Sequence, residues 1–170
     1  MFAIDQLVVY PAQGVGRVER IENQEIGGAN ADFYIVRILS NNVTLLVPVK
    51  NAKNVGLRPI SDADHGKTIF DSLKDRSDFT GYCGQNWNRR YREYSEKLKS
   101  GDLKDVAYVL KELLLIGKDK ELSFGERRLL EQAMNLLTME LAHALGRTPV
   151  DVKQEIETLF ADALVRQEEK

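Results

Sequence analysis

The spacing of apolar residues changes once along this chain, close to Ile60 and Ser61, and this change constrains the fold more than any other feature. Before it, apolar and polar residues alternate in short runs, the pattern of half-buried strands. After it, apolar residues recur every three or four positions, the pattern of amphipathic helices. The sequence therefore predicts an α+β protein with a β domain at residues 1–60 and a compact helical domain at residues 61–170.

Turn residues divide the first domain into short segments. Pro, Gly and Asn separate five expected strands, at residues 2–10, 18–26, 33–39, 43–47 and 57–60. Strands of this length and spacing favour a small SH3- or Tudor-like β-barrel, and the pattern alone leaves a flat sheet as the alternative. The domain has six basic and five acidic residues, so its charge is close to neutral.

Helix start signals precede the three strongest apolar stripes of the second domain. Asp102 is placed to cap one helix, Ser123 with Glu126 forms a capping-box pattern, and Thr148 precedes Pro149 at a first helical position. Two further helices are expected earlier, at residues 63–73 and from Trp87 onward, joined by an exposed loop at 75–85. We therefore expect a bundle of five helices.

The composition excludes several classes of protein. Among 170 residues, 43% are apolar, which is enough for a buried core. The single Cys83 and two histidines without ligand spacing predict no disulfide and no metal site. The sequence shows neither a membrane span of ~20 apolar residues nor a signal-peptide pattern. It also has no recognisable motif around a serine or cysteine nucleophile and no glycine-rich phosphate-binding loop. We expect a cytoplasmic protein without a cofactor or enzymatic activity.

The charge balance makes DNA binding by bulk charge unfavourable, because the net charge is −2. One segment, residues 86–99, is a local exception with five basic and two acidic residues. It contains the only tryptophan, Trp87, followed by Arg89, Arg90 and Arg92. Any contact with DNA is therefore expected at this segment.

Two interpretations of Trp87 remain open from the residues alone. On a helix its side chain shares a face with Tyr91, Tyr94 and Leu98, as a core aromatic would. At the start of that helix it could instead project outward beside the arginines. An exposed ring next to guanidinium groups can unstack a base step and hold its phosphates.

The predicted strand at 43–47 has a second informative pattern. Its period of two turns Val43, Leu45 and Val47 inward, and it turns Thr44 and Leu46 outward. A single exposed leucine is common in proteins. On the edge of a sheet, however, it can mark the place where a partner adds its own strand.

The order and spacing of several short motifs make the chain resemble the CarD/CdnL family of bacterial transcription regulators. These motifs are Val8-Val9-Tyr10-Pro11, Gln13-Gly14-Val15-Gly16, Pro48, Asn51-Ala52, Val55-Gly56-Leu57-Arg58, Trp87-Asn88-Arg89-Arg90-Tyr91, Ser100-Gly101-Asp102 and Leu122-Ser123-Phe124-Gly125-Glu126-Arg127. The resemblance implies a Tudor-like N-terminal domain that binds the β subunit of RNA polymerase, and a helical domain that engages promoter DNA. The N-terminal motifs are also similar to the polymerase-interacting domain of transcription-repair coupling factors, but the chain has no helicase motifs.

The resemblance also implies roles for individual residues on the DNA side. Trp87 would be a minor-groove wedge at the upstream edge of the melted promoter. Basic residues would hold the DNA backbone, with Arg127 and Arg128 as additional phosphate contacts beside Arg89, Arg90 and Arg92.

On the polymerase side, the resemblance implies docking through the exposed face of the barrel at Gln24, Ile26, Thr44 and Leu46. Some family members are similar elsewhere but have basic residues at the positions of Gln24 and Leu46, so a more apolar interface is expected here.

These expectations combine into one function and one alternative. The protein would dock on polymerase as a monomer, associate with the nucleoid through it, and stabilise the open promoter complex. Its contact with free DNA would be weak and show little sequence specificity. The alternative is a Tudor-like adaptor between proteins, without direct DNA contact, in which Trp87 is a core residue.

Overall fold

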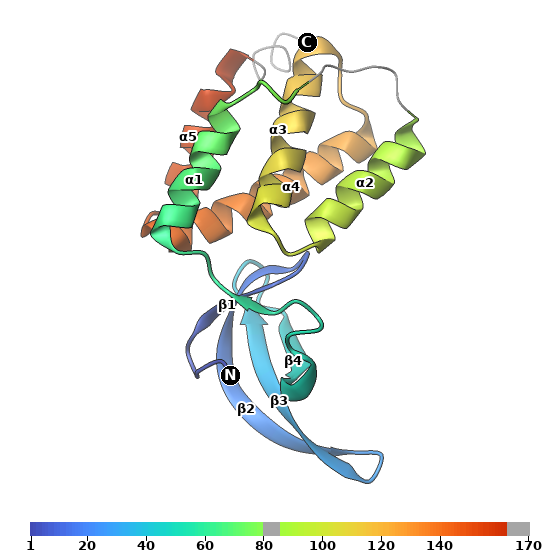
Figure 1. Ribbon diagram of the computed structural model, residues 1–170, viewed down its shortest axis with the longest axis vertical. Coiled ribbons are helices and arrows are strands. Elements are labelled where there is room, and N and C mark those ends of the chain that lie inside the picture. Colours follow the sequence, from blue (N-terminus) through green and yellow to red (C-terminus); the bar gives the residue numbers. More distant parts are fainter. Residues whose placement is uncertain (80–85, 163–170) are drawn as a thin grey trace. The chain divides into compact units, whose positions relative to one another are not determined.

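The computed structural model describes residues 1–79 and 86–162, so most of the predicted loop at 75–85, including Cys83, lies outside the described residues. The chain divides into two compact units, Met1–Ile60 and Ser61–Lys170 (Figure 1). The division falls where the spacing of apolar residues changes. Strands make up the first unit and helices the second, so the predicted α+β class is confirmed.

The N-terminal unit is one antiparallel sheet with the strand order β4-β3-β2-β1-β5. Its elements are β1 (Leu7–Tyr10), β2 (Gly14–Ile26), β3 (Ala29–Ile38), β4 (Thr44–Pro48), the short helix η1 (Val49–Asn51) and β5 (Arg58–Pro59). The first strand is shorter than predicted, because residues before Leu7 form a turn in which Asp5 has a φ of 69°. This order puts β4 at an end of the sheet, as expected.

The core of this unit lies on one face of the sheet. Val18, Tyr34 and Val36 are almost completely buried there. A bulge between Val18 and Arg20 shifts the register of β2 against β3 and increases the local twist. Gly16 permits the close approach of these strands, since a Cβ atom at this position would lie 2.6 Å from Cγ1 of Val36. The glycine therefore has a packing role in the sheet.

The C-terminal unit contains five helices among the described residues: α1 (Ala63–Lys74), α2 (Trp87–Lys99), α3 (Leu103–Asp119), α4 (Phe124–Leu145) and α5 (Pro149–Leu159). The three predicted start signals are confirmed, because the side chains of Asp102, Ser123 and Thr148 each accept a hydrogen bond from a backbone N–H of the first turn. None of the described helices is long and apolar enough to cross a membrane.

Helices α3 and α4 lie at the centre of this core. Helix α3 contacts α1, α2 and α4, and α4 also contacts α1, α2 and α5 (Figure 1). Leu110 and Leu113 of α3 have no exposed surface, and Leu137 and Leu141 of α4 are buried equally deeply. Because α2 packs on both α3 and α4, its first turn has a fixed place beside the start of α4.

Candidate functional site

The first turn of α2 carries the tryptophan that the sequence singled out. The side chain of Asn86 caps this helix by accepting a hydrogen bond from the backbone N–H of Asn88, at 2.8 Å. The cap satisfies one of the amide groups that a helix start leaves without a partner. Trp87 is therefore the first helical residue.

The ring of Trp87 is partly buried and packs against the helical core. Its Cζ2 atom lies only 2.9 Å from the position that a Cβ atom on Gly125 would take. Tyr91, one turn further along α2, meets the ring edge to face, with centroids 5.7 Å apart and planes at 61°. The ring is thus held against α4 yet keeps an exposed part, so it combines features of both interpretations made from the sequence.

Arg90 lies beneath this ring and not on the surface. Its side chain is 4% exposed, and Nη2 donates to Oε2 of Glu126 at 3.0 Å. The guanidinium also lies 5.5 Å from the ring centroids of Trp87 and Tyr94. Drawing Arg90 out toward a phosphate would leave the Glu126 carboxylate buried without this partner, at high cost. The prediction that Arg90 contacts the DNA backbone is therefore corrected: this residue supports Trp87 from within the fold.

Glu126 links the start of α4 to α2. It accepts hydrogen bonds from Nζ of Lys120 at 2.7 Å and from the backbone N–H of Ser123 at 3.0 Å, in addition to the bond from Arg90. Burial raises the pKa of this carboxyl, but these hydrogen bonds to its charged form outweigh burial and lower the pKa to about 2. The base of the site is therefore a charged, fully hydrogen-bonded pair.

The other predicted DNA-contact residues lie on the surface. Arg89 is 81% exposed and forms an ion pair with Glu93, with Nε and Oε1 3.3 Å apart. Arg92 is also exposed on α2, and Arg127 and Arg128 are exposed in the first turns of α4. Arg127 and Arg128 follow Gly125, the α4 residue that lies beside Trp87.

One residue near the ring was missed in the sequence. Phe124, the first residue of α4, is 79% exposed and directly precedes Gly125. Its position in the sequence could have indicated this exposure, because an apolar residue next to the Ser123 cap lies outside the buried stripe of the helix. Among the described residues, no cluster of His, Cys, Asp and Glu could hold a metal ion beside it or elsewhere.

The four predicted polymerase-contact residues share the outer face of the sheet. The pairing register shows this, because their partners on β3 are all odd-numbered residues: Leu46 with Ile35, Thr44 with Arg37, Gln24 with Ala31 and Ile26 with Ala29. Leu46 is 50% exposed and Ile26 is 58% exposed. The outward direction predicted for Thr44 and Leu46 is thus confirmed. Val43 was wrongly placed inward: it precedes β4 and is 44% exposed.

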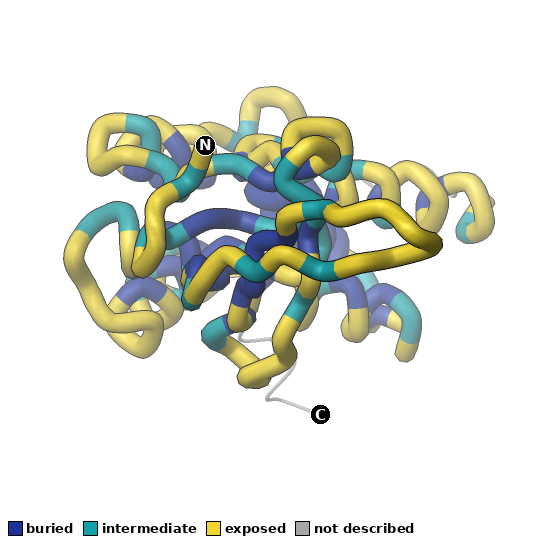
Figure 2. Tube along the Cα trace, turned by 90° about the horizontal axis from the view of Figure 1, so that it is seen from below, coloured by how far each residue is buried: buried dark blue, intermediate teal, exposed yellow. Residues whose placement is uncertain are grey.

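This outer face is long and has a mixed character. Six positions of β3 separate the partners of Ile26 and Leu46, which corresponds to about 20 Å along the strand. The Ile26 end belongs to the exposed tip of the β2–β3 hairpin (Figure 2). Gln24 is tied into the sheet surface by donating to Glu22 at 3.2 Å. Leu46 and Ile26 are therefore two separate exposed apolar points, and the β3 residues between their partners on this face are Ala31 and the buried Phe33.

Comparisons with known proteins match both units. Residues 2–61 match the family described as CarD-like/TRCF RID domain, and residues 68–157 match the family described as CarD, C-terminal domain. The chain is also similar to a protein of Bacillus subtilis (strain 168) named "Putative transcription factor YdeB". The two are 29% identical over 158 residues, which cover 90% of this chain and 98% of that protein.

Proposed function

The chain belongs to the CarD family of transcription regulators, and from this premise we propose that it docks on the β subunit of RNA polymerase and stabilises the open promoter complex. The Met1–Ile60 unit would dock through Gln24, Ile26, Thr44 and Leu46. The helical unit would then place Trp87 against the DNA at the upstream edge of the melted region.

The setting of Trp87 is the observation that carries this proposal. A core tryptophan would be fully enclosed, and an unsupported surface ring would lose conformational entropy on binding. This ring is partly exposed, and it is supported by Gly125, Tyr91 and Arg90. A rigid aromatic group with a free part is suited to insert at a distorted base step in the minor groove.

The remaining cations would hold the adjacent backbone. Arg89, Arg92, Arg127 and Arg128 are exposed in the first two turns of α2 and α4, whereas Arg90 is buried against Glu126 and has no part in this contact. Phosphate contacts carry no sequence information, so little sequence specificity is expected. A few cations on a molecule of net charge −2 give weak affinity for free DNA.

Docking on polymerase compensates for this weak affinity. A tethered domain meets its second binding site at an effective concentration of roughly millimolar. An aromatic contact worth about 1–3 kcal/mol, formed only with open DNA, would shift the balance between closed and open complexes about 5- to 150-fold. A monomer that recognises polymerase is sufficient for this effect.

The test is Trp87→Ala, measured for thermal unfolding, polymerase affinity and open-complex lifetime on one preparation of the full chain. We expect the lifetime to fall while polymerase affinity stays the same. Tyr108→Ala, which removes a ring 37% exposed on α3, is the matched control and should keep the lifetime.

The packing of Trp87 against the helical core favours the alternative, an adaptor without DNA contact. For that function, Trp87→Ala would lower stability by ~3–5 kcal/mol and reduce all activities together. Loss of polymerase binding in parallel with a collapsed melting temperature would refute the wedge.

A further inference from the structure

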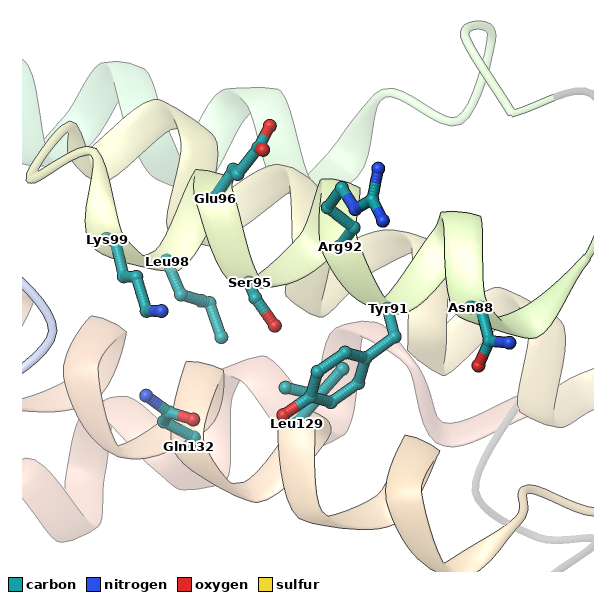
Figure 3. Close-up of a pocket in the computed structure, with 9 residues that line it drawn as sticks. All are labelled: Asn88, Tyr91, Arg92, Ser95, Glu96, Leu98, Lys99, Leu129 and Gln132. Atoms are coloured by element: carbon teal, nitrogen blue, oxygen red, sulfur yellow. The ribbon is translucent and has the colours of Figure 1, made fainter.

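An open groove of about 680 Å³ runs between α2 and α4 in the helical unit (Figure 3). Its floor contains Leu98 and Leu129, and its walls are mostly polar. Asn88, Tyr91, Ser95 and Lys99 point from α2 toward the α4 side, which contributes Gln132, while Arg92 and Glu96 point away from α4. Trp87 directly precedes the first of these residues, so the groove begins beside the proposed wedge.

The pairing of the cations on α2 distinguishes this groove from the rest of the helix. Three of the five are paired with carboxylates: Arg89 with Glu93, Arg90 with Glu126 and Lys97 with Asp105. The other two, Arg92 and Lys99, form no ion pair with any residue that the structure describes, and both line the groove. Within the described part of the chain, Lys99 is therefore an unpaired cation of α2 that points into the groove, and Arg92 lies at the edge of the groove.

We propose that this groove binds the sugar-phosphate backbone of one strand of promoter DNA, which extends the contact from Trp87 to Lys99. This inference rests on the proposed function, because Trp87 determines where the strand enters. Lys99 would contact a phosphate as a point charge, and the hydroxyl of Ser95 and the amides of Asn88 and Gln132 would donate hydrogen bonds to phosphate oxygens.

The dimensions of α2 fit an extended polyanion. Arg92 and Lys99 are seven residues apart, about 10 Å along the helix, and Lys99 lies about 18 Å beyond Trp87. A strand of duplex DNA rises about 3.4 Å per nucleotide, so a contact of this length covers several phosphates. An apolar peptide helix is a poorer match, because the two leucines of the floor are almost completely buried and offer little surface.

Salt dependence tests the proposal directly. Binding of the full chain to a forked DNA oligonucleotide is measured between 50 and 200 mM salt for wild type, Lys99→Gln and Lys97→Gln. Both variants lose one charge from the last turn of α2, but Lys97 does not line the groove and is already paired with Asp105. Losing one phosphate contact lowers the salt slope by about 0.9, so Lys99→Gln should weaken binding about 3.5-fold more at 50 mM than at 200 mM. Lys97→Gln should lack this salt-dependent loss.

A second pair of variants tests the opposite wall. Gln132→Glu places a carboxylate in the groove, and Asn135→Glu places one on an exposed position of α4 outside it. The two have the same net charge. We expect Gln132→Glu to weaken DNA binding by at least threefold relative to Asn135→Glu; equal affinities would overturn the groove as a DNA site.

The outcomes separate this inference from the proposed function. If Trp87→Ala shortens the open-complex lifetime while Lys99→Gln matches Lys97→Gln, the wedge stands and the groove proposal fails. If Trp87→Ala has no effect on lifetime, the proposed function fails whatever Lys99 does. If Lys99→Gln weakens binding to polymerase and leaves DNA binding intact, the groove binds protein and the proposal is refuted.

Discussion

The indole ring of Trp87 lies against Gly125 so closely that a Cβ atom there would be 2.9 Å from Cζ2. Gly125, which has no side chain, therefore helps to support the indole ring of Trp87. Gly125 is the second residue of α4 and has an ordinary helical backbone, so its small size is required by the neighbouring ring and not by its own conformation.

Gly125→Ala should displace the Trp87 ring without destabilising the protein. Alanine is the better helix former by about 0.5–1 kcal/mol, so the melting temperature should stay the same or rise. We expect a shift in tryptophan emission and a severalfold shorter open-complex lifetime. In a Trp87→Ala background the same change should have no further effect on lifetime. An unchanged emission spectrum and lifetime would show that the ring has room to adapt.

Leu46→Glu should weaken the complex with polymerase by tenfold or more. The substitution places a charge on an outward position of the end strand β4, where a docked partner would remove it from water. Ile4→Glu, at a 58% exposed position in the N-terminal turn, is the control of equal charge. Titration of both variants with purified polymerase measures the difference, and similar affinities would exclude this face of the sheet.

Arg89→Ala and Arg92→Ala should each shorten the open-complex lifetime less than Trp87→Ala does. Their loss should diminish as salt rises, because phosphate contacts act through counterion release, whereas the wedge depends less on salt. Lys153→Ala, exposed on α5, provides the control for a general charge effect. Open-complex decay measured at several salt concentrations distinguishes the arginine variants from Trp87→Ala. If the effect of Trp87→Ala had the same salt dependence, the roles given to the arginines as phosphate contacts and to Trp87 as a wedge would be contradicted.

Acid should destabilise the helical unit through Glu126. Its folded-state pKa is about 2 and the ordinary value is 4.5, so its contribution is complete above about pH 4.5 and is lost as the pH falls toward 2. Glu126→Gln should lower the free energy of unfolding by about 3–5 kcal/mol at pH 7, because Arg90 stays buried without its carboxylate partner. The variant should then show no further loss of stability from this residue as the pH falls. Denaturant unfolding between pH 2 and 7 measures both effects. Glu131→Gln, at an exposed position of the same helix, should keep wild-type stability at pH 7.

The isolated Ser61–Lys170 unit should keep its fold and lose its effect on promoters. It has its own core around α3, but it lacks the unit proposed to bring it to polymerase. Circular dichroism tests the fold, and transcription at equal protein concentration tests the function. Full activity of this fragment would contradict tethering.

Local signals account for what the sequence predicted well. The helix starts at Asp102, Ser123 and Thr148 depend on residues within one turn, and the outward direction of Leu46 depends on the period of a strand. The burial of Arg90 could not be found in this way. Its partner Glu126 is 36 positions away, and only the packing of α2 on α4 shows that this arginine is internal while Arg89 and Arg92 are exposed.

The bond between Arg90 and Glu126 also has a consequence for synthetic fragments. A peptide of α2 alone would contain the tryptophan and every arginine of that helix, yet it would have neither Glu126 to neutralise Arg90 nor Gly125 to hold the ring. In such a peptide Arg90 would be one more solvated cation, so the peptide would bind nucleic acid more strongly and less selectively than the folded chain. Nucleic-acid affinities measured on this peptide would reflect the charge of the peptide and not the binding of the folded protein.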